Sequence, residues 1–554
     1  MAESYELTLD VAGMTCEHCE RAVAKALRSV PGVREVLEVS HARALARIVA
    51  GPEATNEGIA QAVGAAGYRA TIRTARRADR SPAAHGNGGE FDLLVVGGGS
   101  AGFAAAIKGA ELGARVALVE GGTLGGTCVN VGCVPSKTLI RAAEAQHRRA
   151  HHGFAGIPSA DGRPEWAAVR AQKDSLVAAL RQAKYWDVLR AYDAITLVEQ
   201  RATLTSGRSV RLADGRTLTG GKVVVTTGAS PWAPPIPGLA EVGYLDSTGA
   251  MALDRLPRSL LVIGGSAVGL ELAQMFSRLG VQVTVLEALP RLVPSEEPAI
   301  GQALAGYLRD EGLAIHTGVQ ITRVARRRDG YTVAFDEGGA ARTVSADQLL
   351  VATGRRANTA GLGLEALGVT LGPKGEIAVN EFLQSSHPDL YAAGDVIGDP
   401  MFVYVAAYGG TVAAENALAG NRRRYDLTAL PKVTFTDPAV ASVGLTEAEA
   451  RAQGLEPLVA TLPLEHVPRA LAARDTRGFV RLLAHPDTRK ILGAHILAAE
   501  AGEMVTEAAL AIRFGLTTDD LTATFHPYLT LSEGIKLAAQ TFTKDVAKLS
   551  CCAA

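Results

Sequence analysis

The chain carries almost no excess charge, because 56 Lys and Arg residues stand against 57 Asp and Glu residues in a total of 554. Without a basic surplus we expect no nucleic-acid partner. No apolar run reaches the roughly 20 residues that a membrane-spanning helix needs, so we expect no membrane span. The first residues lack a positive stretch followed by an apolar one, which argues against a secretory signal and for a cytoplasmic protein.

Cysteine is scarce, with six residues in the whole chain, yet none of them stands alone. In the cytoplasm, close thiols are more often metal-binding or catalytic than structural disulfides. Because thiolates prefer soft cations and exchange electrons in pairs, the pattern suggests a soft ligand that passes between cysteine pairs and undergoes two-electron chemistry. The pairs are Cys16 with Cys19, Cys128 with Cys133, and Cys551 with Cys552.

Residues 1–72 have the pattern of a small domain. Strands and helices are expected in the order βαββαβ, over 5–11, 16–30, 33–40, 42–49, 59–66 and 68–72. This order predicts a ferredoxin-like sandwich. Residues 73–89 begin with several Arg residues and continue with Ser, Pro, Ala and Gly, and this composition predicts a flexible linker.

Two later segments echo each other. Residues 93–102 and 260–269 both run from an apolar strand into a glycine-rich turn and then a helix. Such a turn lets the backbone approach a pyrophosphate at the positive end of the helix, so the repeat predicts two Rossmann-like dinucleotide-binding domains. The pattern changes from about residue 430, and we expect a last helical stretch over 533–549.

The first glycine loop is the more complete fingerprint. It contains Gly97, Gly99 and Gly102, and the next strand, 116–119, ends in Glu120. A carboxylate about twenty residues after the loop is what a ribose hydroxyl needs. The alternative is an ordinary tight turn between a strand and a helix, which the complete strand–helix–strand context disfavours.

The second glycine loop is less regular. Its strand ends in Glu287, which favours the unphosphorylated ribose of NADH, whereas Arg291 could instead meet a 2′-phosphate. A purely structural turn is a less remote alternative here than in the first loop. The loop residues are Gly264, Gly265, Ser266 and Gly269, with the serine in the middle glycine position.

A second pair of cysteines lies just past the first nucleotide fingerprint. Cys128 and Cys133 are five residues apart and open a helix, so they can close a disulfide when oxidised, and the helix start lowers a thiol pKa. The segment 125–137 closely resembles the pyridine nucleotide-disulphide oxidoreductases, the group of glutathione and lipoamide dehydrogenases. The resemblance covers about 90–550 and includes the motifs at 352–355 and 391–395.

This resemblance implies an α/β and α+β multidomain chain that binds FAD and a nicotinamide. The FAD-binding domain would comprise 90–245 together with 365–425, and the NAD(P)H-binding domain 246–364. Residues 426–554 would form a C-terminal α+β dimerisation domain. The protein would then be a homodimer in which each active site borrows the partner's C-terminal segment.

The family's residue roles carry over to matching positions. Cys133 would face the flavin as a thiolate, and Cys128 would be the interchange thiol. Lys137 would lie near the flavin, paired with Glu271, and Asp395 would bind the ribityl chain. Further cofactor contacts are expected from Ser100, Gly126, Thr127 and Gly354.

One position departs from the disulfide reductases of this family. They use a histidine as proton shuttle, and anchoring on Glu533 puts Tyr528 in its place. A two-residue slip would align His526 instead. Tyrosine is a poor base near neutral pH, since its ordinary pKa is about 10.

This departure, with the terminal Cys551 and Cys552, makes the chain resemble the mercuric reductase group. The resemblance implies that the terminal cysteines receive Hg(II) inside the partner's active site and pass it to the redox pair. Tyr528 would assist at the metal site, and a second tyrosine is matched to Tyr185.

The loop 13–19, Gly-Met-Thr-Cys-Glu-His-Cys, resembles the heavy-metal-associated domain of copper chaperones. The thiolates of Cys16 and Cys19 would project from a helix start, ready for Cu(I) or Hg(II). A redox dithiol or an incidental loop is the alternative. We expect a tethered scavenger that raises the local metal concentration.

Together these features predict mercury detoxification, in which NAD(P)H and FAD reduce Hg(II), delivered as thiol complexes, to Hg(0). The resemblance favours NADPH, and NADH stays open. One alternative is a disulfide reductase of the lipoamide or glutathione type with an accessory metal domain, which Tyr528 and the terminal cysteines disfavour. Another is a metal-binding or storage protein, which the redox pair and both nucleotide loops disfavour.

Overall fold

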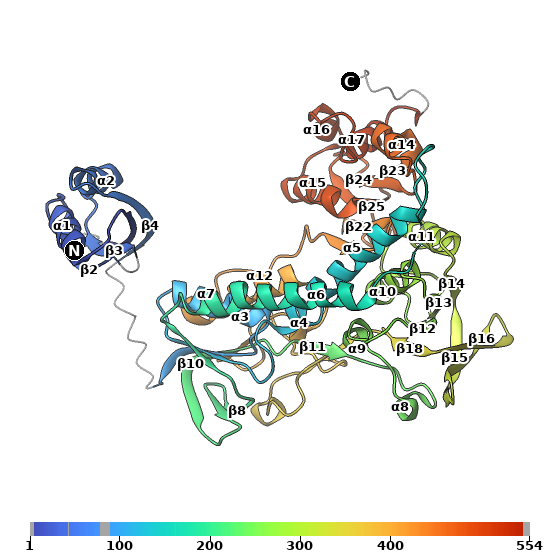
Figure 1. Ribbon diagram of the computed structural model, residues 1–554, viewed down its shortest axis with the longest axis horizontal. Coiled ribbons are helices and arrows are strands. Elements are labelled where there is room, and N and C mark those ends of the chain that lie inside the picture. Colours follow the sequence, from blue (N-terminus) through green and yellow to red (C-terminus); the bar gives the residue numbers. More distant parts are fainter. Residues whose placement is uncertain (1–4, 42–43, 78–88, 161, 547–554) are drawn as a thin grey trace. The chain divides into compact units, whose positions relative to one another are not determined.

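The computed structural model describes residues 5–41, 44–77, 89–160 and 162–546. The chain divides into two compact units, 1–88 and 89–554 (Figure 1). Cys551 and Cys552 lie outside the described residues, as does most of the expected linker. Within the described ranges, no helix has the length and apolar character needed to cross a bilayer.

The first unit is a four-stranded antiparallel sheet in the order β2-β3-β1-β4, combined with two helices. Alternation along β1 places Leu7, Leu9 and Val11 in a core that Val23 and Leu27 of α1 complete. The βαββαβ prediction is confirmed. The elements are β1 (Tyr5–Ala12), α1 (Glu17–Arg28), β2 (Val33–Ser40), β3 (Leu45–Ala50), α2 (Asn56–Ala65) and β4 (Arg69–Arg77).

The last strand of this unit is longer than the sequence pattern predicts. β4 continues through Arg77 instead of ending at residue 72, because it pairs with β1 along its whole length and Tyr5 lies opposite Arg77. Across this pair, the Arg73 guanidinium lies 2.6 Å from the Asp10 carboxylate. The start of the expected linker therefore belongs to the sheet, since strand pairing satisfies its backbone groups.

The second unit begins with a seven-stranded sheet in the order β7-β6-β5-β10-β9-β8, in which β20 also pairs with β10. The strands β5, β6, β7 and β20 run parallel to their neighbours, and all but the edge strand β7 are mostly buried, as in sheets covered on both faces. The strands are β5 (Phe91–Val96), β6 (Val116–Val119), β7 (Ile195–Val198), β8 (Ala202–Ser206), β9 (Ser209–Leu212), β10 (Thr217–Val225) and β20 (Leu390–Ala392).

Two helices far apart in sequence share one core with this sheet. α3 (Ser100–Glu111) and α12 (Val403–Ala419) bury Phe103 and Val412 together with Leu93 of β5. The stretch 365–425 thus returns to the sheet of the first nucleotide loop, to which it supplies β20 and α12.

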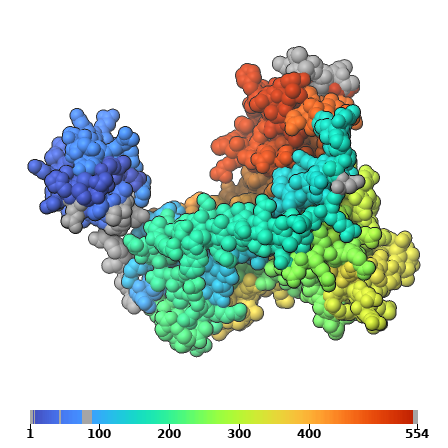
Figure 2. All heavy atoms as spheres, viewed as in Figure 1, coloured from blue at the N-terminus to red at the C-terminus, as the bar shows by residue number. Residues whose placement is uncertain are grey.

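A helical segment leaves this sheet and lies along the surface of the second unit (Figures 1 and 2). Its first two helices carry Cys128 and Cys133. The helices are α4 (Gly126–Asn130), α5 (Cys133–Ala150), α6 (Trp166–Arg181), the π-helical turn η1 (Gln182–Trp186) and α7 (Asp187–Leu189).

The second nucleotide loop belongs to a parallel sheet in the order β14-β13-β12-β18, which is followed by an antiparallel sheet of β15, β16 and β17. The strands β11 (Ala229–Pro231) and β19 (Arg355–Ala357) pair with each other. The other elements are α8 (Leu239–Val242), α9 (Ser247–Met251), β12 (Ser259–Ile263), α10 (Ala267–Arg278), β13 (Gln282–Glu287), α11 (Pro298–Asp310), β14 (Ala314–Thr317), β15 (Val319–Arg327), β16 (Gly330–Glu337), β17 (Ala340–Ala346) and β18 (Gln348–Val351).

The C-terminal part is an antiparallel sheet in the order β21-β22-β25-β24-β23 with helices packed on it. The last helix, α17 (Glu533–Gln540), ends well before residue 549, and the Thr541 hydroxyl donates to the Ala538 carbonyl at 2.8 Å in competition with the backbone ladder. The other elements are β21 (Lys432–Thr434), β22 (Ala439–Gly444), α13 (Glu447–Ala452), β23 (Leu458–Pro463), α14 (Pro468–Ala473), β24 (Phe479–Ala484), β25 (Ile491–Ala498), α15 (Ala501–Phe514) and α16 (Thr518–Ala523).

Candidate redox and metal sites

A cavity of about 1080 Å³ in the second unit brings together eleven of the predicted site residues. The first glycine loop, the redox helices α4 and α5, and the start of α10 from the second nucleotide domain form its walls. The predicted residues that line it are Gly97, Gly99, Ser100, Glu120, Gly126, Thr127, Cys128, Cys133, Lys137, Glu271 and Asp395.

The glycines of the first loop are needed for different reasons. Gly97 has φ +112°, and a Cβ there would lie 2.4 Å from the Thr226 carbonyl oxygen, so only glycine fits. A Cβ on Gly102 would lie 1.7 Å from the Gly97 oxygen. A Cβ on Gly99 would meet only Gly126 Cα, at 3.6 Å, so open space remains beside this backbone. That space suits the pyrophosphate of FAD at the start of α3.

The polar groups around the loop fit the rest of FAD. Glu120 accepts hydrogen bonds from the Gly98 N–H at 2.6 Å and the Gly122 N–H at 2.5 Å, which leaves lone pairs for ribose hydroxyls. Burial raises the pKa of Asp395. The Arg355 Nε lies 3.7 Å from Asp395 and, among the described residues, has no hydrogen-bond partner. A hydroxyl-rich ribityl chain would satisfy such buried polar groups.

The redox cysteines are an unequal pair of free thiols. Cys133 is the first residue of α5, and Cys128 lies in α4. A hydrogen bond from the Cys128 thiol lowers the pKa of Cys133 to about 7, and the positive charge of Lys137 assists this shift against burial. The same hydrogen bond, with burial, raises the pKa of Cys128. Cys133 is therefore the thiolate of the pair and Cys128 the protonated thiol.

A partly buried ion pair lies beside the Cys133 thiolate. The Lys137 Nζ lies 2.6 Å from the Glu271 Oε2, and the Glu271 side chain is only 6% exposed. The other carboxylate oxygen accepts from the Phe435 N–H at 2.9 Å, and the Lys137 Nζ lies 4.6 Å from the centre of the Phe435 ring. No motif or spacing in the sequence points to Phe435, which lies far along the chain in the C-terminal domain.

The second glycine loop has the same construction as the first. Gly264 has φ +118°, and a Cβ there would lie 2.3 Å from the Ala352 oxygen. Glu287 accepts from the Gly265 N–H at 2.6 Å and from the Leu289 N–H at 2.7 Å, as Glu120 does in the first loop. A nicotinamide dinucleotide fits this loop, because Glu287, like Glu120, has lone pairs left for ribose hydroxyls.

Four predicted cofactor residues of the second nucleotide region have structural roles or contacts within the chain. Ser266 is the N-cap of α10 with an extended backbone, and a Cβ on Gly269 would lie 2.1 Å from the Gly264 oxygen. The Arg291 Nη2 donates to the Pro294 oxygen at 2.8 Å. Gly354 accepts from the Trp232 N–H at 3.0 Å beside the β11–β19 pair and does not line the cleft.

Tyr185 packs against α3 and does not line the cleft. It belongs to the π-helical turn η1, and its ring centre lies 4.7 Å from that of Phe103 in α3. Burial raises the pKa of Tyr185, while a hydrogen bond with Ser100 acts in the opposite direction. π-Helical turns occur often at functional sites, but the catalytic role of Tyr185 stays a prediction.

The two candidates for the family's base differ in exposure. The His526 Nε2 lies 2.6 Å from the Glu507 carboxylate, and the His526 side chain is 4% exposed. This hydrogen bond raises the pKa of His526. Tyr528 is 56% exposed on the C-terminal domain. The histidine is held by a carboxylate of its own chain and the tyrosine is largely exposed, and the alignment on Tyr528 stays a prediction.

The N-terminal cysteines form a second thiol site. Cys16 is exposed and Cys19 is buried, with 3.5 Å between their sulfurs. The Thr15 backbone N–H and then the Tyr68 hydroxyl donate to Cys19 and lower its pKa to about 6. In the described parts of the chain, no three His, Cys, Asp or Glu side chains are grouped to hold a metal ion. Two sulfurs suit a soft cation, and no motif or spacing in the sequence points to Tyr68.

Two nucleotide loops on parallel sheets, with a free dithiol and a lysine–glutamate pair in a cleft lined by the first loop and by the helix that follows the second, define a dithiol oxidoreductase with two nucleotide cofactors. Residues 91–410 match the pyridine nucleotide-disulphide oxidoreductase family, and 430–539 match its dimerisation domain, which indicates a homodimer. Residues 8–69 match the heavy-metal-associated domain.

Proteins with similar sequences show which branch of the dithiol oxidoreductases the chain resembles. The chain is 42% identical to a mercuric reductase of Staphylococcus aureus over 98% of each chain. It is 50% identical to one of Streptomyces lividans, over 84% of this chain and 98% of that protein. The chain belongs to the pyridine nucleotide-disulphide oxidoreductases, in the mercuric reductase branch that these relatives represent.

Among solved structures, the chain resembles the HOCl-induced flavoprotein disulfide reductase RclA from Escherichia coli. The TM-score is 0.73 at 30% identity, over 82% of this chain and 100% of that chain. The Cu(II) complex of the same protein gives a TM-score of 0.74. This likeness confirms the predicted fold class, a flavoprotein disulfide reductase fold with an added metal domain.

Proposed function

We propose that the chain reduces Hg(II), bound by thiols, to elemental Hg(0) with electrons from a reduced nicotinamide. The observation that carries this proposal is the free Cys128–Cys133 pair in a cleft that residues of both nucleotide domains line. One reduced nicotinamide, one proton and one Hg(II) dithiolate give one oxidised nicotinamide, Hg(0) and two thiols. Hg(0) has no affinity for thiolate and leaves the site.

Each residue of the redox pair has a separate task. Cys133 is half-ionised near pH 7 and can attack Hg(II) directly, whereas Cys128 must lose its proton as the metal binds. Lys137 keeps positive charge beside the thiolate. Gly99, Glu120 and Asp395 would hold FAD, which would supply two-electron transfer between the nicotinamide and the dithiol.

Transfer between cysteine pairs belongs to the same proposal. Cys16 and Cys19 would collect Hg(II), and Cys551 and Cys552 would hand it to the redox pair of the partner subunit by ligand exchange. The exposure of Tyr528 on the dimerisation domain supports a site shared between subunits. A cytoplasmic location is part of this proposal, since thiols stay reduced there.

The nicotinamide that the second loop favours is NADH. Glu120 and Glu287 accept from backbone N–H groups in the same way, and the ribose of FAD carries a free 2′-hydroxyl. The Glu287 carboxylate would repel a 2′-phosphate, and the Arg291 Nη2 is committed to the Pro294 oxygen, although the buried Arg291 Nε has no hydrogen-bond partner among the described residues. The structure thus supports NADH over the NADPH that the family resemblance favours.

The test follows nicotinamide oxidation by the purified protein in excess small thiol, with and without Hg(II), while volatile mercury is trapped. NADH and NADPH are compared, with oxidised lipoamide and glutathione as control substrates. Hg(II)-dependent oxidation with matching Hg(0) release is expected, and it should be faster with NADH. Turnover of a disulfide without Hg(0) would assign the chain to the disulfide reductases. Faster turnover with NADPH would overturn only the choice of nicotinamide.

A further inference from the structure

The C-terminal domain reaches the redox site of its own chain through one short segment. Beside Phe435, whose N–H donates to Glu271, the Asp437 N–H donates to the Gln274 side chain at 2.8 Å. The Gln274 amide returns a 2.8 Å bond to the Asp437 carbonyl, and the Arg278 Nη1 lies 2.9 Å from the Asp437 carboxylate. These α10 residues share one face of the helix, so segment 435–437 is docked along it.

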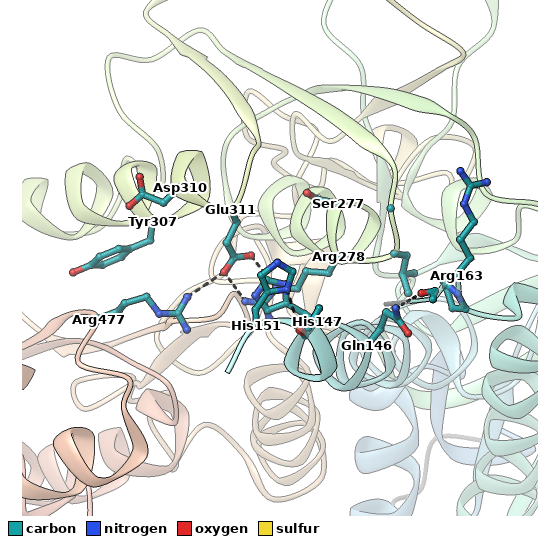
Figure 3. A pocket seen from close by; sticks show the side chains of 15 residues that line it. Gln146, His147, His151, Arg163, Ser277, Arg278, Tyr307, Asp310, Glu311 and Arg477 are labelled. Carbon is teal, nitrogen blue, oxygen red and sulfur yellow. Dashed lines mark hydrogen bonds and ion pairs between the residues drawn. The ribbon is translucent and has the colours of Figure 1, made fainter. Parts of the chain in front are cut away.

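At the C-terminal end of α10, the contact with segment 435–437 joins a network of largely buried charges. The Arg278 side chain is 4% exposed and lies 2.6 Å from Glu311, which the Arg477 guanidinium also reaches at 3.0 Å (Figure 3). The same guanidinium lies 3.0 Å from Asp437. Groups that are paired in this way hold α10 and the C-terminal domain in one register. The position of Phe435 relative to Glu271 is therefore fixed by the tertiary structure.

The ring of Phe435 makes a contact that core packing does not explain. It is 38% exposed, yet the Lys137 ammonium lies 4.6 Å from its centre and is also held by Glu271. An aromatic face attracts a cation at this distance. Lys137 stands one helical turn after Cys133 in α5, and its charge stabilises the thiolate.

We propose that Phe435 is a positioning residue of the redox site, whose ring holds the Lys137 ammonium beside Cys133. Through this ring and the Phe435 N–H, the dimerisation domain contacts both members of the Lys137–Glu271 pair beside the redox thiol. This inference does not depend on which substrate the dithiol reduces.

The test measures the alkylation rate of Cys133 against pH in the reduced holoenzyme, with mass spectrometry to separate Cys133 from Cys128. Phe435→Leu keeps apolar bulk and the backbone N–H but removes the aromatic face, whereas Phe435→Tyr keeps the face. Phe154→Leu is the matched control, because that ring is 45% exposed and outside the site.

We expect the profile of Phe435→Leu to move to higher pH. A half-unit rise in the pKa of Cys133 would slow alkylation at pH 6 roughly threefold. Phe435→Tyr and Phe154→Leu should follow the unmodified enzyme. A profile of Phe435→Leu that does not move would overturn the proposal. Equal shifts in Phe435→Leu and Phe435→Tyr would also overturn it, because they would show a steric role rather than a role of the ring face.

Discussion

The two described thiol pairs lower a thiol pKa by different means. In the N-terminal domain, neutral hydrogen-bond donors, the Thr15 backbone and the Tyr68 hydroxyl, stabilise the Cys19 thiolate. A neighbouring thiol assists in both pairs, but in the cleft the positive charge of Lys137 also stabilises the Cys133 thiolate against burial. Both pairs present one ionised sulfur near neutral pH, but only the second lies among the nucleotide loops.

This difference separates capture from chemistry. The N-terminal pair depends on one small domain and has an exposed sulfur in Cys16, so it can take a metal from small thiols and release it again by exchange. The redox pair depends on groups from α4, α5, α10 and the C-terminal domain. Its environment should therefore be more sensitive to distant substitutions.

The largest expected effect comes from removal of the redox thiolate. Cys133→Ala should lower Hg(II)-dependent nicotinamide oxidation at least about a thousandfold, because the variant lacks the thiolate of the pair and Cys128 alone cannot hold Hg(II) between two sulfurs. The measurement is turnover in excess small thiol. Hg(II) binding to the N-terminal pair, followed by titration, serves as the control and should persist. A fully active variant would contradict the assignment of the redox pair.

A distant substitution should damage the second unit and leave the first intact. Arg278→Leu removes one member of a buried charge network and leaves Glu311 and Asp437 short of a partner, which should cost about 3–5 kcal/mol of stability. Chemical unfolding of the full chain measures this loss. Arg115→Leu, at an exposed ion pair in the same unit, is the matched control and should cost under about 1 kcal/mol. Similar losses in both variants would refute the importance of the network.

The pH dependence of alkylation should distinguish the two pairs. The thiolate is the reactive form, and a lowered pKa makes it available at lower pH. The rate should therefore rise through about pH 6 for Cys19 and about pH 7 for Cys133. In Tyr68→Phe, loss of a donor should raise the pKa of Cys19 and slow its alkylation about twofold at pH 6, as a half-unit shift gives. A change at Cys133 in this variant would contradict the separation.

The smallest effect is expected from deletion of residues 1–88. They form a compact unit of their own, and the cleft residues all come from the second unit. The rate of Hg(II) reduction in excess small thiol should stay within about twofold, since the thiol replaces the captured supply. The same assay at limiting thiol should reveal any role in supply. A dead truncation would show that the N-terminal domain takes part in the chemistry.

Much of the fold could be read from local patterns. The βαββαβ order and the two glycine loops are signals within about thirty residues, and strand 91–96 agrees with β5. Element ends were less predictable. β4 extends to Arg77 because β1 offers it a partner, and α17 stops at Gln540 where threonine hydroxyls take backbone carbonyls. Such competition depends on contacts that a sequence pattern does not contain.

The sequence by itself determined which chemistry was available: paired soft thiols, turns that only glycine can make, and carboxylates at the ends of two strands. The tertiary structure decided which thiol ionises and what holds it. Phe435 reaches Glu271 across 164 residues, and the Tyr68 hydroxyl stabilises the Cys19 thiolate from the position just before β4. The physical reason is that a pKa depends on the charges, donors and burial around a group in space, whereas local sequence fixes only its neighbours along the chain.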